Sequence, residues 1–324
     1  MNRSTFVGLL SIISALTFIL NGLVIVLGFL NRRKFFTAYD TTMLFLMLIE
    51  FLQGVVGYPI ELLTDIEHGG FSCVLAGYLV TSLALASISL LAALALMRLI
   101  SVMFPFKSRL LLNSKKNSLY FIVPSTLYGF AWGTFPLLGW SKYSPELNSD
   151  RRCSVDLIGR DKNTLSYLYA LMVGCYLIPL TVMSVSAFII AKRLRRSTHS
   201  INVKHEKART AQMKKERRTT LFLYVVIAAF VIAWTPYALM IFLISLGESV
   251  TRNWLDYSSL LAKSSTFYNP LIHVIMHKRN RVSLFNFLTV QRISNTNSQE
   301  ISLHGRSNEV QGGRANQQNV SSAP

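Results

Sequence analysis

The chain has 324 residues, of which 51% are hydrophobic and only 15% are charged, whereas soluble globular domains carry about 25% charged residues. This composition argues against a water-soluble domain. The formal net charge of +18 comes from 33 basic and 15 acidic residues. Nucleic-acid-binding proteins place such charge on a folded polar surface and not between long apolar segments, so we expect a protein of the lipid membrane with no nucleic-acid partner.

Seven apolar segments follow one another along the chain, and each is long enough for the ~20 residues that cross a bilayer as a helix. They cover residues 5–30, 41–64, 73–104, 119–140, 164–191, 219–246 and 254–276. The first is longer than the ~7–15-residue core of a cleaved signal peptide, so we expect it to remain as a helix. The predicted fold is therefore an all-α membrane protein, a seven-transmembrane helix bundle.

The basic residues are distributed unevenly between the two sides of this bundle. The connectors 31–40, 104–117 and 192–218, the residues after 276 and the helix-end Arg98 together hold 25 of the 33 basic residues. Loops rich in Lys and Arg remain in the cytoplasm. We therefore expect a multi-pass protein of the cell membrane, with its amino terminus extracellular and its carboxyl terminus cytoplasmic.

Two further features follow the seventh segment. Residues 280–288 have the pattern of a short amphipathic eighth helix that lies along the membrane surface. The following residues are rich in Ser, Asn, Gln and Gly and contain few large apolar side chains, which predicts disorder. The expected organisation is a helical domain at 1–290 and a disordered cytoplasmic tail at 291–324.

Several polar residues and prolines lie inside the apolar segments. Polar side chains are costly in a bilayer, so each needs a partner or a function. We expect Asn21, Glu50, Ser87 and Asn269 to meet in a water-filled interior, the alternative being hydrogen bonds that only hold helices together. Four prolines, each expected to kink its helix, interrupt the segments: Pro59, Pro179, Pro236 and Pro270.

Three cysteines leave room for one disulfide and one free thiol. Cys73 and Arg98 are 25 residues apart on one predicted helix, or ~37 Å, so they lie at its outer and cytoplasmic ends. Cys153 lies in the long outer loop, and a Cys73–Cys153 disulfide would join this loop to the helix. Cys175 lies in the middle of a span and is expected to be a packed free thiol.

Together these features resemble the rhodopsin-like G-protein-coupled receptors over roughly residues 5–290. The matching residues are Leu20-Asn21-Gly22, Leu46-x-x-x-Glu50, Cys73 with Cys153, Trp234-Thr235-Pro236 and Asn269-Pro270. The resemblance implies coupling to a heterotrimeric G protein through Arg98, with Glu216 as its cytoplasmic ion-pair partner. Three positions depart from the family pattern, namely Met97-Arg98-Leu99 in place of an acidic-Arg-Tyr triplet, His273 in place of a tyrosine, and Glu50 in place of an aspartate.

Lys263 lies in an apolar stretch of the seventh segment, two helical turns outward of Pro270 and near the middle of the membrane. Desolvation there favours the neutral amine, which condenses with aldehydes to a Schiff base. The position matches the retinal-attachment lysine of opsins, and the resemblance is to opsins outside the vertebrate visual group, with the cnidarian opsins among the candidates. Retinal is then the implied cofactor, 11-cis in the dark and all-trans after light. The alternative is a lysine that pairs with a carboxylate for packing or for an anionic ligand.

Other residues strengthen the resemblance to opsins. The segments 135–146 and 153–156 look like the second extracellular loop of opsins, which forms a lid over the chromophore. Lys142 and Asp156 match the ion pair that steadies this lid. Trp234 and Tyr237 match the aromatic residues that line the retinal pocket.

A charged retinal linkage needs a nearby anion. The position of the vertebrate visual counterion is occupied here by Ala76. Glu146 matches a loop carboxylate that many opsins use instead. Glu61 lies three turns outward of Glu50 on the second segment, and the resemblance implies that this position faces the attachment end of the pocket, where some cnidarian opsins place a carboxylate. We expect one of these two to be the counterion; the alternatives are a solvated loop charge for Glu146 and a carboxylate at the outer interface for Glu61.

The predicted function is that of a light-sensing G-protein-coupled receptor. Two alternatives are a retinal photoisomerase of opsin fold, suggested by the altered triplet around Arg98 and by His273, and a receptor for a diffusible ligand. Receptor kinase and arrestin are candidate partners at the Ser-rich tail. No metal-ligand cluster or phosphate-binding loop occurs in the sequence, so neither a metal site nor an enzyme is expected.

Overall fold

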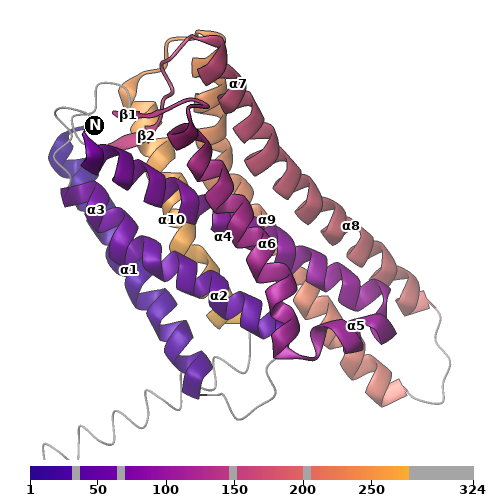
Figure 1. Ribbon diagram of the computed structural model, residues 1–324. Helices are drawn as coiled ribbons and strands as arrows, with labels where there is room; N and C mark the ends of the chain where they lie inside the picture. Colours follow the sequence, from indigo (N-terminus) through magenta and orange to yellow (C-terminus); the bar gives the residue numbers. More distant parts are fainter. Residues whose placement is uncertain (31–36, 64–69, 146–151, 200–205, 277–324) are drawn as a thin grey trace, which may run out of the picture. The chain divides into compact units, whose positions relative to one another are not determined.

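The computed structural model describes residues 1–30, 37–63, 70–145, 152–199 and 206–276. The predicted eighth helix at 280–288 and the predicted tail at 291–324 lie outside these residues, so both stay predictions. The side chain of Glu216 and all of Glu146 also lie outside the described part. The described residues up to Met276 form one compact unit, a bundle of long helices with a two-stranded sheet near one end (Figure 1).

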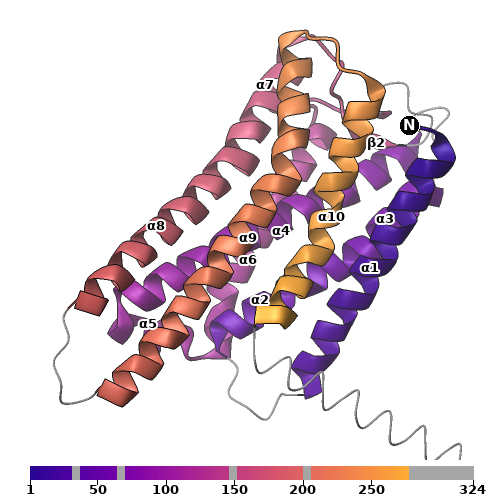
Figure 2. The same cartoon turned by 180° about the vertical axis from the view of Figure 1, so that it is seen from behind.

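Four long helices of the bundle are continuous. They are α1 (Arg3–Leu30), α4 (Phe71–Met103), α9 (Glu206–Leu246) and α10 (Arg252–Met276). Viewed from behind, α9 and α10 run side by side, and α10 also packs against α1 and α2 (Figure 2). α10 therefore lies between α1 and α9 in the bundle.

The other spans are built from several pieces. The second consists of α2 (Ala38–Leu52), a π-helical turn η1 (Gln53–Gly57) and α3 (Tyr58–Leu63). After the short helix α5 (Pro105–Leu112), the fourth consists of η2 (Lys115–Ser118), α6 (Leu119–Thr134) and η3 (Phe135–Leu138). The fifth consists of α7 (Lys162–Leu171), a π-helical turn η4 (Met172–Leu177) and α8 (Ile178–His199).

Each of the two π-helical turns lies just before one of the prolines expected to interrupt the spans. A proline lacks an amide hydrogen, and its ring collides with the carbonyl of the residue four positions earlier. For Pro59 and Pro179 those residues are Val55 and Cys175, which lie inside η1 and η4. The wider π turn accommodates the ring within a continuing helix. Pro236 and Pro270, in contrast, lie inside helices α9 and α10 that continue past them.

Helix starts follow local capping signals. At the start of α2, Thr37 and Asp40 form a reciprocal capping box, in which each side chain accepts a hydrogen bond from the other's backbone N–H. Asp161 caps α7 by accepting a hydrogen bond of 2.9 Å from the backbone N–H of Thr164. This backbone hydrogen bond holds the pKa of the Asp161 carboxyl below its usual value.

Six helices in the described part of the chain are long and apolar enough to cross a membrane. α10 falls below that level of hydropathy because it carries charged and hydroxyl-bearing residues along its length. Its packing against three other spans nevertheless makes it the seventh helix of the predicted bundle.

Two helices extend further than the apolar segments predict. The fifth and sixth segments are expected at 164–191 and 219–246, but α8 continues to His199 and α9 begins at Glu206. The additional turns are rich in Lys, Arg and Glu, which are good helix formers. Membrane hydropathy detects only the part of a helix that crosses the bilayer, so these extensions were missed.

A small sheet, absent from the sequence predictions, closes one end of the bundle. β1 (Tyr143–Pro145) and β2 (Cys153–Val155) are antiparallel, with Tyr143 opposite Val155. The predicted disulfide between Cys73 and Cys153 is confirmed and joins β2 to α4. Next to this hairpin, the predicted ion pair between Lys142 and Asp156 has an N–O distance of 3.6 Å. We call this hairpin with its disulfide the lid.

Candidate ligand-binding site

A cavity of about 160 Å³ lies inside the bundle, beneath the lid. α3, α4, β2, η4, α9 and α10 all contribute to its wall. Most of the lining side chains are aliphatic or aromatic, among them Val80, Leu85, Ile88, Leu168 and Ile241. Such a cavity suits a mostly apolar ligand whose orientation is set by a few polar groups.

Lys263 provides a cation in the wall of this cavity. Its Nζ donates a hydrogen bond of 2.7 Å to Oε2 of Glu61 on α3. The side chains of Lys263 and Glu61 are 14% and 4% exposed. Removal of either partner would leave a buried charge without its counter-charge, which costs about 3–5 kcal/mol in buried pairs. The two helices are thus joined at the point where the amine meets the cavity.

Tyr58 also holds Lys263 in place, although the sequence analysis did not identify it. Its hydroxyl donates a hydrogen bond of 3.1 Å to the backbone carbonyl of Lys263, and its ring centroid lies 5.5 Å from Nζ. Tyr58 precedes Glu61 by three residues, so both lie on one face of the helix. That spacing was the signal that could have identified Tyr58.

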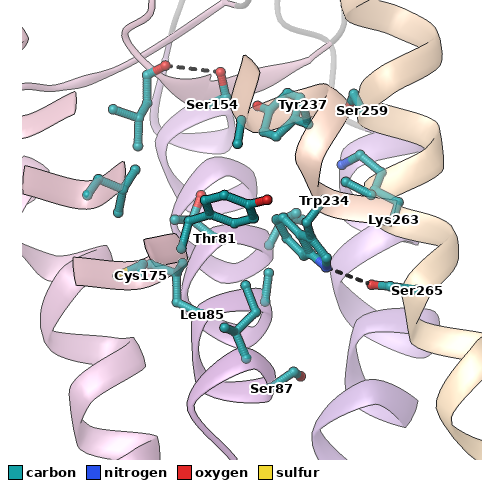
Figure 3. Close-up of a pocket in the computed structure, with 18 of the residues that line it drawn as sticks. Thr81, Leu85, Ser87, Ser154, Cys175, Trp234, Tyr237, Ser259, Lys263 and Ser265 are labelled. Carbon is teal, nitrogen blue, oxygen red and sulfur yellow. Dashed lines mark hydrogen bonds between the residues drawn. The ribbon is translucent and has the colours of Figure 1, made fainter. Parts of the chain in front are cut away.

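The aromatic residues of α9 form another part of the wall. Figure 3 shows Trp234 and Tyr237 beside the same space toward which Lys263 extends from α10. The Nε1 of Trp234 donates a hydrogen bond of 3.1 Å to Oγ of Ser265, and its ring stacks on Phe230 with centroids 6.3 Å apart. The hydrogen bond fixes the orientation of the indole relative to α10.

The lid closes the cavity on one side. Cys153, Ser154 and Val155 of β2 all line it. Because the disulfide attaches Cys153 to α4, the strand is held against the cavity at a fixed point. The lid therefore restricts access from this end of the bundle.

Three of the four predicted core polar residues gather at the opposite end of the cavity. Glu50, Ser87 and Asn269 line it, and Asn269 Nδ2 donates a hydrogen bond to Oε1 of Glu50. Asn21 is fully buried but lies outside the cavity lining. Its side-chain amide donates to the backbone carbonyls of Thr17 and Thr266, at 2.9 and 3.0 Å, and so joins α1 to α10.

Arg98 lies far along α4 from Cys73, as the sequence predicts. Its guanidinium carbon is 3.5 Å from the centroid of the Tyr39 ring on α2. Its predicted partner Glu216 is in α9, but that side chain is outside the described residues. Glu146 is also outside the described residues. Of the two candidate counterions, the structure therefore locates only Glu61 relative to Lys263.

Comparisons with known proteins agree with this arrangement. A family model described as 7 transmembrane receptor (rhodopsin family) matches residues 20–273. The visual pigment-like receptor peropsin of Mus musculus is 25% identical over 86% of this chain and 83% of its own. A G0-coupled rhodopsin of Mizuhopecten yessoensis is 24% identical over 85% of this chain and 70% of its own. The crystal structure of squid rhodopsin superimposes with a TM-score of 0.77 at 21% identity, over 89% of this chain and 87% of that one.

Proposed function

Because the chain belongs to the rhodopsin family of seven-transmembrane receptors and is of the opsin type, we propose that it senses light with retinal attached at Lys263. The observation that carries this proposal is a primary amine held in a largely apolar, lidded cavity by a buried carboxylate at 2.7 Å. A lysine that pairs with a carboxylate for packing would show the same ion pair, so the largely apolar cavity beside the amine is the feature that favours retinal. The residues present therefore fit retinal.

Each part of the cavity has a role in this proposal. Lys263 is the attachment point, and the aliphatic side chains together with Trp234 and Tyr237 enclose the polyene. Retinal, when bound, supplies the absorption of visible light and a change of shape from 11-cis in the dark to all-trans. Tyr58 fixes the backbone of Lys263 through its hydroxyl, so the attachment point keeps its direction. The lid excludes water from this end of the cavity.

We propose Glu61 as the counterion of the attached retinal. A carboxylate that already contacts the nitrogen of Lys263 is positioned to stabilise a positive charge on that atom, and its 4% exposure limits screening by water. Glu146 remains the alternative carboxylate, on the sequence resemblance alone. The variants described in the Discussion separate the two.

The second part of the proposal concerns signalling. Light-driven rearrangement of the bundle would free Arg98 to engage a heterotrimeric G protein on the cytoplasmic side, with Glu216 restraining it in the dark. The distribution of basic residues supports this orientation, because Lys and Arg are concentrated in the connectors next to that end of α4. Receptor kinase and arrestin are proposed as partners of the Ser-rich tail.

A retinal photoisomerase is the second candidate function. It is favoured by Met97 and Leu99, which flank Arg98 in place of an acid and a tyrosine. His273 is a further departure: it is buried on α10, and its ring lies 6.2 Å from that of Phe222 on α9. An isomerase would change the retinal isomer in light without promoting nucleotide exchange on a G protein.

One experiment tests the proposal against both alternatives. The chain is expressed with 11-cis retinal, purified in the dark, and examined for a visible absorption band and for light-dependent nucleotide exchange on G proteins of several classes. We expect both signals. A visible pigment that yields all-trans retinal without exchange on any class would support the isomerase. Absence of any pigment would contradict retinal binding and favour a receptor for a diffusible ligand.

A further inference from the structure

The guanidinium group of Arg98 stacks on an aromatic ring. Its carbon Cζ lies 3.5 Å from the centroid of Tyr39, close to van der Waals contact. Arg98 Nε is buried and makes no hydrogen bond within the described part of the chain. The positively charged plane lies over the negative face of the ring, the geometry of a cation–π contact.

The neighbouring residues explain why the ring is the partner. Residue 97 is Met, which is fully buried and provides no carboxylate. Asp40 directly follows Tyr39, but its carboxylate accepts hydrogen bonds from the backbone N–H and the hydroxyl of Thr37 in the capping box. Among the described residues, none of the ion pairs involves Arg98. Arg98 therefore contacts the Tyr39 ring, while Met97 occupies the position of the acidic residue in the family's acidic-Arg-Tyr triplet.

Tyr39 is itself held firmly. It is the second residue of α2 and only 8% exposed. The capping box fixes the start of this helix, so the ring cannot follow Arg98 without disturbing α2. The contact therefore joins the ends of α2 and α4 at the end of the bundle where Arg98 lies.

We propose that Tyr39 restrains Arg98 in the resting receptor, in addition to any restraint by Glu216. While the guanidinium lies over the ring, the face that contacts the ring is not available to a partner protein. Activation then requires this contact to open. The cation–π energy that is present in the resting state and lost in the active state therefore favours the resting state. This inference rests on the proposed function, because it assumes that Arg98 engages a G protein.

The test uses the full-length dark pigment reconstituted with a G protein that the parent activates. Tyr39→Leu removes the ring, and we expect dark nucleotide exchange to rise about fivefold to tenfold, the effect of losing a partly buried cation–π contact. Tyr39→Phe keeps the ring, and its dark exchange should remain at the parent level. This rescue by Phe separates the ring contact from a role of the hydroxyl or a general loosening of the helix.

Two further variants serve as controls. Tyr120→Leu, at a 71% exposed tyrosine on α6, should leave dark exchange unchanged. Tyr39→Met places a longer and more flexible apolar side chain at this position, and it replaces Tyr39→Leu if the latter yields too little folded pigment. The dark absorption spectrum of each variant checks that the pocket is intact.

The outcomes distinguish this inference from the proposed function. If the parent shows light-dependent exchange but Tyr39→Leu, or the Tyr39→Met variant that replaces it, leaves dark exchange unchanged, Tyr39 does not restrain Arg98, and the receptor function stands. Equal increases for Phe and Leu would also overturn the inference, because the ring would then be irrelevant. A parent without light-dependent exchange would overturn the proposed function and, with it, the role of Tyr39.

Discussion

Arg152 and Asp256 form an ion pair in which both side chains are almost completely buried, at 3% and 5% exposure. Arg152 directly precedes β2 of the lid, and Asp256 lies on α10 two turns outward of Lys263. The guanidinium carbon also lies 4.5 Å from the centroid of the Phe6 ring on α1. The pair therefore joins the lid to the helix that carries the proposed attachment lysine.

Arg152→Met should destabilise the protein by about 3 kcal/mol, because it leaves Asp256 buried with only two more distant partners, the amino-terminal ammonium group of Met1 at 3.8 Å and Arg252 at 3.9 Å. Thermal unfolding can be followed by the reaction of the buried free thiol of Cys175 with a fluorescent dye. The double variant Arg152→Met with Asp256→Leu should recover part of the loss, since neither charge of this pair is then left buried without the other.

The matched control for this prediction is Lys142→Met, which removes the exposed partner of Asp156 next to the same lid, while Asp156 keeps the hydrogen bonds it accepts from the backbone N–H groups of Ile158 and Gly159. Lys142 is 70% exposed, so this change should cost less than about 1 kcal/mol. Equal destabilisation by Arg152→Met and Lys142→Met would contradict the structural importance of the buried pair.

Lys263→Ala should abolish the covalent pigment, because it removes the amine that lines the cavity. Borohydride reduction after incubation with retinal, followed by mass spectrometry, measures the attachment. Since this change also leaves Glu61 unpaired, Lys263→Ala combined with Glu61→Gln provides a variant without a buried charge for the same measurement. Lys142→Ala should leave attachment intact. Retinal trapped on either Lys263→Ala variant would show that another residue is the attachment site.

Glu61→Gln should move the dark absorption at neutral pH from the visible to the ultraviolet. A neutral amide cannot stabilise a positive charge on the attached nitrogen as the carboxylate at 2.7 Å does. Absorption spectra recorded from acid to alkaline pH, with and without chloride, follow the charge on this nitrogen, and recovery of the visible band by chloride would show that an anion can replace the carboxylate.

Two variants control the counterion experiment. Glu146→Gln tests the alternative carboxylate, and Glu248→Gln alters an exposed residue between α9 and α10. Both should resemble the parent if Glu61 is the counterion. An ultraviolet-absorbing Glu146→Gln pigment beside an unchanged Glu61→Gln pigment would reverse the assignment.

Glu216→Gln should raise dark nucleotide exchange, because it removes a negative charge proposed to restrain Arg98 across the cytoplasmic ends of the helices. The measurement is exchange by the dark pigment, with Glu206→Gln at the start of the same helix as the control. An unchanged dark signal would remove Glu216 from the mechanism and leave Tyr39 as the proposed restraint. Increases for both Glu216→Gln and Tyr39→Leu that multiply in the double variant would indicate two independent restraints.

Properties that depend on composition and local spacing were predictable from the sequence. The number of spans follows from the thickness of a bilayer, because each helix needs about 20 apolar residues. The Cys73–Cys153 disulfide follows from a cysteine at the outer end of a helix and another in the facing loop, and the structure confirms it. Lys263 stands out because a lysine amid apolar residues is unusual in any span.

Only the tertiary structure decided which groups meet. Whether Glu61 faces Lys263 depends on the rotation of α3 about its own axis, and one extra residue in a helical turn changes that rotation by about 100°. The π-helical turn η1 before Pro59 sets this rotation, and hydropathy does not reveal it. The contacts of Arg98 with Tyr39 and of Arg152 with Asp256 join residues that are 59 and 104 positions apart. Such pairs depend on how helices pack, and a single sequence read along its length carries no signal for them.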